Sequence, residues 1–214
     1  PPPPTPPPPT RHSSSAASDV YKRQAQYLPA AERNQLASQV DRLVIPALLR
    51  AVNGGEERQI IDISGNSLQD FSFPTWFLRT LHDTRMPGKR VVLQWPAWAA
   101  REQLKAARRL IDELSPQGVQ FSVSDINADP KSLELLESLK LQFVTLNREL
   151  TRELETEPQR MDTIREIIRH AEQMQVLTIA SDVPTSGDLA MLWRVGVKLV
   201  SGAFIQETPR VIGQ

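Results

Sequence analysis

Four polar residues stand at or just beyond the ends of short apolar runs, and they are the candidates for ligand chemistry in this chain. They are Asp62, Gln94, Asp125 and Asp182. Runs of this length, bounded by polar and turn-forming residues, predict buried strands. Hard cations take several oxygen ligands, so carboxylate and amide oxygens gathered at neighbouring strand ends could bind a cation or a polar ligand.

Each candidate also has a simpler structural explanation. Asp62 and Asp125 could be solvated or could cap the turn after a strand, which is the commoner role of aspartate there. Asp182 could approach the base of a ligand, yet Asp182-Val183-Pro184 is also an ordinary turn sequence. Trp95 and Trp98 could stack on a purine, but packing at the rim of the fold is the favoured interpretation.

The elements that must position these residues alternate between strand and helix. Strands are expected at 60–64, 90–95, 119–123, 143–146, 176–180 and 198–200, and helices at 74–82, 99–114, 132–139 and 160–175. Leu189, Leu192 and Trp193 mark one face of a further helix. Gly196 follows where a left-handed helix end is expected. This alternation predicts an α/β barrel with parallel strands.

The N-terminal part of the chain has a different character. Residues 1–24 are rich in proline and serine and are expected to be disordered, or to be a sequence scar that does not belong with the rest. A helix is expected from residue 29, with Leu36, Val40, Leu43 and Val44 on one face. Pro46 lies inside this pattern and predicts a kink or a restart.

Composition limits the classes of partner. Lys plus Arg and Asp plus Glu are balanced at 25 each, so no net charge favours nucleic acid or an anionic membrane. The chain has no cysteine, which excludes disulfides and thiolate metal sites. No apolar run reaches the ~20 residues that span a bilayer. We therefore expect a cytoplasmic protein with no nucleic-acid or membrane partner.

The segment from residue 176 to 207 resembles the end of an EAL domain, the fold of cyclic-di-GMP phosphodiesterases. Its sub-pattern LAMLWRVGV…GAFIQE is closest to the FimX-type EAL domains of type IV pilus regulators. The resemblance covers residues 25–214 and implies a TIM-type (β/α)8 barrel that is incomplete at its first strand, the one carrying the ExLxR signature. The strands at 60–64 and 199–203 would then be the open edges of the sheet.

The same resemblance locates the positions where the enzymes bind two Mg²⁺ or Mn²⁺ ions. Here these positions hold Asp62, Gln94, Ser124, Asp125, Thr145, Ser181 and Ser201. The EAL glutamate is absent, and Thr145 stands where the enzymes have a catalytic lysine. The resemblance therefore implies no catalytic residue, no metal site and no cofactor, with Asp62, Gln94, Asp125 and Asp182 left as weak ligand-binding candidates.

Two functions remain after this comparison with the family. One is a catalytically inactive regulatory or protein-interaction module, with a PilZ-type, pilus or motility protein as its partner and a homodimer as a further possibility. The other is an effector that binds cyclic-di-GMP without hydrolysing it. The absence of the ExLxR strand and the change of the family's xVE turn to Asp182-Val183-Pro184 favour the interaction module slightly.

Overall fold

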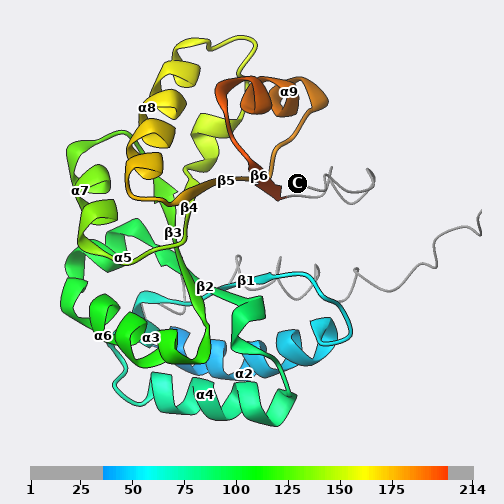
Figure 1. Cartoon of the computed structure of the whole chain (residues 1–214), viewed down its shortest axis with the longest axis vertical. Coiled ribbons are helices and arrows are strands. Elements are labelled where there is room, and N and C mark those ends of the chain that lie inside the picture. The colour runs from blue at the N-terminus through cyan, green and yellow to red at the C-terminus, as the bar shows by residue number, and fades with distance from the viewer. Residues whose placement is uncertain (1–35, 202–214) are drawn as a thin grey trace, which may run out of the picture.

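The computed structural model describes residues 36–201, which form one curled parallel sheet with helices along its convex side (Figure 1). The sheet has six strands in the order β1-β2-β3-β4-β5-β6. Their bounds are β1 Gln59–Asp62, β2 Val91–Pro96, β3 Gln120–Ile126, β4 Phe143–Leu146, β5 Leu177–Ser181 and β6 Leu199–Ser201. Each strand pairs in parallel with the next along the chain. The result is a half-barrel, as the TIM-type prediction implied.

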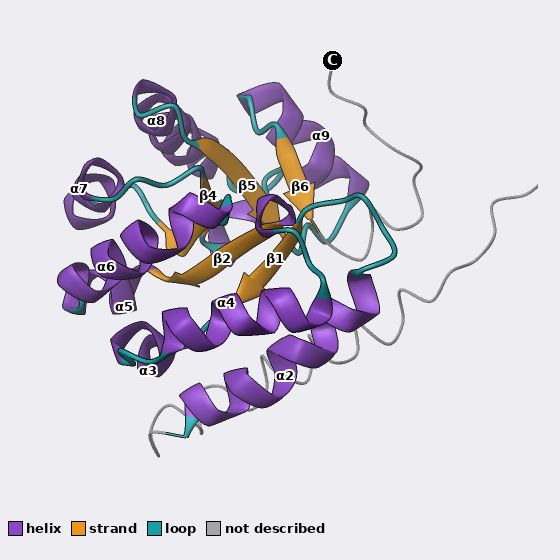
Figure 2. Cartoon of the chain, turned by 60° about the horizontal axis from the view of Figure 1, so that its bottom comes forward, coloured by secondary structure: helices purple, strands orange, loops and turns teal. Residues whose placement is uncertain are grey.

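Helices connect the strands and surround them when the molecule is viewed from below (Figure 2). They are α2 Ala37–Val52, α3 Gly65–Gln69, α4 Phe73–Thr84, α5 Ala97–Glu102, α6 Leu104–Leu114, α7 Pro130–Ser138, α8 Gln159–Gln173 and α9 Ser186–Val195. Short 3-10 helices lie at Gly88–Arg90, Ser115–Gln117 and Arg148–Thr151. Within residues 36–201, no helix is both long and apolar enough to cross a membrane.

The sheet has an apolar layer on each face. Leu93 and Trp95 of β2 belong to the large core between the strands and the outer helices. On the other face, Val92, Phe143 and Ile179 form a separate cluster, and Ile60 packs against it. Alternate residues of a strand point to opposite faces, so this second cluster lines the inside of the half-barrel.

Most predicted elements are confirmed, including the strand-helix alternation and the helix end at Gly196, where φ is 106°. Among the described strands, β1 and β6 are the two ends of the sheet order, as expected. Residues 1–24 and the expected start of a helix at residue 29 lie outside the described residues.

Three expectations need correction or completion. The helix expected at 99–114 is two helices, because Gln103 between α5 and α6 leaves the helical region with φ −130° and ψ 39°. Pro46 lies inside α2, which continues to Val52, so of the two expected outcomes the restart is wrong. Leu36, Val40, Leu43 and Val44 share a face of α2, but this face is turned away from the core, since Leu43 is 78% exposed. The buried face instead holds Ala37, Asp41, Ile45, Leu48 and Leu49.

Candidate functional site

A buried polar layer lies inside the half-barrel, toward the carboxyl ends of the strands, and Gln94 is at its centre. The Gln94 amide nitrogen donates a hydrogen bond of 2.8 Å to Oδ1 of Asp62. Its oxygen accepts hydrogen bonds from Ser122 Oγ at 2.9 Å and from Thr145 Oγ1 at 2.6 Å. One side chain of β2 is thereby joined to β1, β3 and β4.

The pleat of the sheet places these residues in one layer. Asp62, Gln94 and Thr145 each follow by two positions a residue of the inner apolar cluster, namely Ile60, Val92 and Phe143. Residues two apart share a face. The register supports the same layer, since Asp62 pairs with Gln94 and Gln94 with Ser122.

The polar layer is shielded from solvent around Gln94. Gln94 is 5% exposed, Thr145 is 4% exposed and Ser122 is fully buried. Buried polar groups are costly unless they are hydrogen-bonded. Both atoms of the Gln94 amide have partners, so this layer is a satisfied network.

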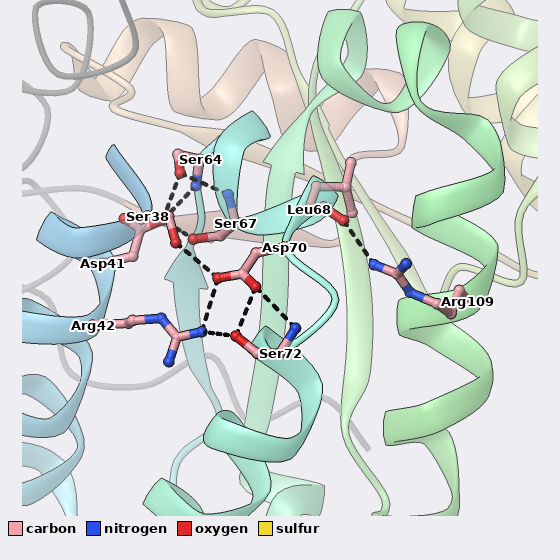
Figure 3. Close-up of polar contacts among 9 residues, drawn as sticks. All are labelled: Ser38, Asp41, Arg42, Ser64, Ser67, Leu68, Asp70, Ser72 and Arg109. Carbon is pink, nitrogen blue, oxygen red and sulfur yellow. Dashed lines mark hydrogen bonds and ion pairs between the residues drawn. The ribbon is translucent and has the colours of Figure 1, made fainter. Parts of the chain in front are cut away.

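The loop after β1 is fixed by a buried acid, Asp41 of α2 (Figure 3). One oxygen of Asp41 accepts hydrogen bonds from the Ser64 nitrogen at 2.8 Å, Ser64 Oγ at 2.7 Å and Ser67 Oγ at 2.7 Å. Asp41 is fully buried. Since Ser64 comes two residues after Asp62, these bonds anchor the end of the strand that carries Asp62.

A neighbouring cluster ties α2 to the loop between α3 and α4 (Figure 3). Asp70 accepts hydrogen bonds from Arg42 at 2.8 Å, Ser72 Oγ at 2.7 Å and the Ser72 nitrogen at 2.9 Å. Desolvation by partial burial alone would raise the pKa of Asp70. The hydrogen bonds from Arg42 and Ser72 outweigh it and lower the pKa to about 2.

The other two candidates lie outside the Gln94 network. Asp125 is exposed at the end of β3, with φ 61°, and accepts a hydrogen bond from Ser124 Oγ at 3.3 Å. Asp182 is exposed after β5, with φ 52°, and forms an ion pair with Arg148. The structure therefore brings together Asp62 and Gln94 of the four candidates.

The donor set of this layer does not fit a pair of Mg²⁺ or Mn²⁺ ions. Such ions require several oxygen ligands, usually including carboxylates. The network contains one carboxylate, Asp62, and Gln94 directs its N–H donor toward that carboxylate. In the part of the chain that the structure describes, no three His, Cys, Asp or Glu side chains are grouped to hold a metal.

The two tryptophans, Trp95 within β2 and Trp98 just after it, lie in different environments. Trp95 is fully buried and its ring lies 6.0 Å from that of Phe121, so it packs between the sheet and the helices. Trp98 is 40% exposed at the start of α5 and lies against Gly65, the first residue of α3. The packing interpretation is confirmed for Trp95, whereas Trp98 keeps an accessible ring.

Sequence reasoning missed Ser122, although a signal for it was present. Gln120, Ser122 and Ser124 alternate with the buried Phe121 and Val123 along β3. Such alternation predicts one polar face, which here is the face that looks into the half-barrel.

Comparison with known proteins agrees with this architecture. The model of the EAL domain family matches residues 14–208. This chain belongs to the EAL domain family. The FimX EAL domain from Pseudomonas aeruginosa bound to c-di-GMP is 25% identical, with a TM-score of 0.77 over 85% of this chain and 75% of that one. The Xanthomonas citri FimX EAL domain in complex with c-di-GMP is 22% identical, with a TM-score of 0.77 over 89% and 77% of the two chains.

Curated relatives include uncharacterised proteins from Mycobacterium bovis and Mycobacterium tuberculosis. Both are 24% identical to this EAL domain over 176 residues, which is 78% of this chain. The chain spans 28% of the length of these relatives.

Proposed function

We propose that this chain is a regulatory EAL domain of cyclic-di-GMP signalling that does not hydrolyse the nucleotide. The Gln94 network is the observation that carries the proposal. Hydrolysis in this family needs metal ions to activate a water. At the strand ends where those ions would bind, the amide of Gln94 accepts hydrogen bonds from two hydroxyls and donates one to the carboxylate of Asp62.

The side chains at neighbouring strand ends support the same proposal. Asp182 is paired with Arg148, so its charge is already balanced by a cation of the protein. Asp125 is exposed to solvent at the end of β3. A regulatory domain of this kind acts through contact with another protein, and the resemblance to FimX-type domains suggests a PilZ-type, pilus or motility protein.

A second function, a non-hydrolysing cyclic-di-GMP receptor, is favoured by two observations. The FimX EAL domain from Pseudomonas aeruginosa was solved with c-di-GMP bound. In this chain Trp98 is 40% exposed just beyond the end of β2, where a purine could stack on its ring. Stacking on a base requires no metal ligand, so this function is compatible with the Gln94 network.

Isothermal titration of the full chain with cyclic-di-GMP, without divalent metal, distinguishes the two functions. Saturable binding that is weakened by Trp98→Ala supports the receptor. The matched control is Trp193→Ala, because Trp193 is 50% exposed on α9 and should leave binding unchanged. No binding supports the nucleotide-independent interaction module. In a separate assay with Mg²⁺ or Mn²⁺ added, metal-dependent hydrolysis would contradict both functions.

A further inference from the structure

An open groove lies at the amino ends of β2 and β3, between the end of α4 and the turn that follows α6. Its volume is about 860 Å³, within the ~300–1,000 Å³ that is usual for ligand-binding clefts. One wall is apolar and consists of Leu78, Leu81, Met86 and Pro87. The Gln94 network is toward the carboxyl ends of the strands, so the groove is a separate site.

Glycines hold the two turns of this groove together. A Cβ at Gly88 would overlap the carbonyl oxygen of Gln117, so a larger residue would force the turns apart. Gly118 has φ 80° and lies against the backbone of Lys89. Backbone packing therefore fixes the shape of the groove.

The groove has basic residues and no acidic ones. His82 and Arg85 are among its lining residues, which include no aspartate or glutamate. The segment 85–90, RMPGKR, adds Lys89 and Arg90, so three of its six residues are cations. Within residues 36–201, none of these three cations forms an ion pair with a carboxylate. Asp83, which follows His82, faces His82 and Arg79.

Arg85 is held in a backbone conformation that favours glycine. It ends α4 with φ 55° and ψ 30°, the left-handed region. Side chains are disfavoured there, and glycine is the usual residue at such a helix end. The turn itself gains nothing from an arginine. The exposed guanidinium beside the apolar wall is what the arginine adds at this position.

We infer that this groove binds an acidic peptide segment of a partner protein. A carboxylate of the peptide binds Arg85, whose planar guanidinium can donate two parallel hydrogen bonds to it. An apolar side chain of the peptide packs against Leu78 and Pro87. In an extended peptide, alternate side chains point to opposite sides, so acidic and apolar residues in alternation match the cations and the apolar wall.

The combination of charge and apolar surface favours a peptide over other anions. A small hydrated anion would gain nothing from Leu78 and Pro87. The chain as a whole has 25 cations and 25 anions among Lys, Arg, Asp and Glu, so the positive charge is local to this turn and provides no broad field for nucleic acid. The inference does not rest on the proposed function, because no residue of the groove belongs to the Gln94 network.

Fluorescence polarisation of the full chain with a labelled hexapeptide of alternating glutamate and leucine tests the inference. Saturable binding that weakens as salt is raised is expected. Two control peptides replace glutamate with glutamine, or leucine with serine, and each should bind at least ~10-fold more weakly. No binding of the first peptide, or equal binding of either control peptide, would overturn the inference.

Arg85→Gly tests the residue that carries the argument. The dissociation constant for the peptide should rise at least ~10-fold. The melting temperature should be unchanged or higher, because glycine adopts φ 55° without strain, so weaker binding would not reflect unfolding. Arg194→Gln is the matched control, since Arg194 is exposed on α9, outside the groove. Unchanged peptide binding by Arg85→Gly, or equal weakening by Arg194→Gln, would overturn the inference.

Titration with cyclic-di-GMP separates this inference from the proposed function. Arg85→Gly should give the same result with the nucleotide as the unmodified chain, whether or not that chain binds it. A change in nucleotide binding as large as the change in peptide binding would overturn the assignment of a separate peptide site.

Discussion

Gln94 donates its amide N–H to Asp62 Oδ1 across 2.8 Å, inside the half-barrel and between two adjacent parallel strands. The same side chain accepts hydrogen bonds from Ser122 and Thr145. In a fold whose enzymes use the strand ends to hold metal ions, this amide instead provides a direct link between protein side chains.

Replacing Gln94 with alanine should destabilise the domain. The substitution removes the shared partner of Asp62, Ser122 and Thr145 and leaves a space in a buried layer. Each buried polar group left without a partner costs about 1–3 kcal/mol, and we expect a total loss of about 3 kcal/mol in the free energy of unfolding. Urea denaturation measures it. Gln117→Ala is the control, because Gln117 is exposed and should change the free energy by less than about 0.5 kcal/mol.

Replacing Asp41 with alanine should be at least as damaging. Three donors from Ser64 and Ser67 would lose a fully buried acceptor. A loss of about 3–5 kcal/mol is expected, because each buried donor left without an acceptor costs about 1–3 kcal/mol. On the same helix, Leu43→Ala should change the free energy by less than about 0.5 kcal/mol in dilute protein, because Leu43 is 78% exposed. Equal effects of the two substitutions on thermal unfolding would contradict this burial pattern.

Asp41 and Leu43, on opposite faces of α2, show which parts of the structure could be predicted from the sequence. The strands and helices follow from short apolar runs and from helical spacing, which are local signals. The orientation of α2 is not local. Its sequence offers two apolar faces, and the inward one is selected by contacts with residues distant in the chain, including the hydrogen bonds from Ser64 and Ser67 to Asp41.

The candidate site could be predicted only in part for the same reason. Asp62 and Gln94 were identified because each lies near the end of an apolar run. Their mutual hydrogen bond depends on the register of β1 with β2. The contribution of Ser122 depends on the register of β2 with β3, and a single run of residues contains no information about either pairing.

Acid should weaken the domain through Asp70. Its pKa is about 2 in the folded chain, below the ordinary 3.8, so the carboxylate form is favoured by folding. This stability is fully present above pH ~4 and is lost as the pH falls from ~4 toward ~2. About 1 kcal/mol is expected after allowance for screening by solvent. Asp70→Asn should remove this part of the pH dependence of urea unfolding, and an unchanged pH profile would show that Asp70 does not contribute.

Gly196 should resist replacement because it ends α9 with φ 106°. A side chain is strained in that conformation, so Gly196→Ala should lower the free energy of unfolding by about 1 kcal/mol. Gly54→Ala is the matched control, since a Cβ at Gly54 would meet no atom within 4 Å. A melting temperature lowered by the same amount in both variants would mean that helix termination at Gly196 carries no special cost.

The most direct test of the central claim is a turnover assay of the full chain with cyclic-di-GMP and saturating Mg²⁺ or Mn²⁺. Formation of the linear dinucleotide is followed by chromatography beside an active EAL phosphodiesterase. The Gln94 network predicts that the linear product forms no faster than in a sample without protein. Metal-dependent product formation well above that background, abolished by Asp125→Ala, would contradict the proposal that this domain does not hydrolyse cyclic-di-GMP.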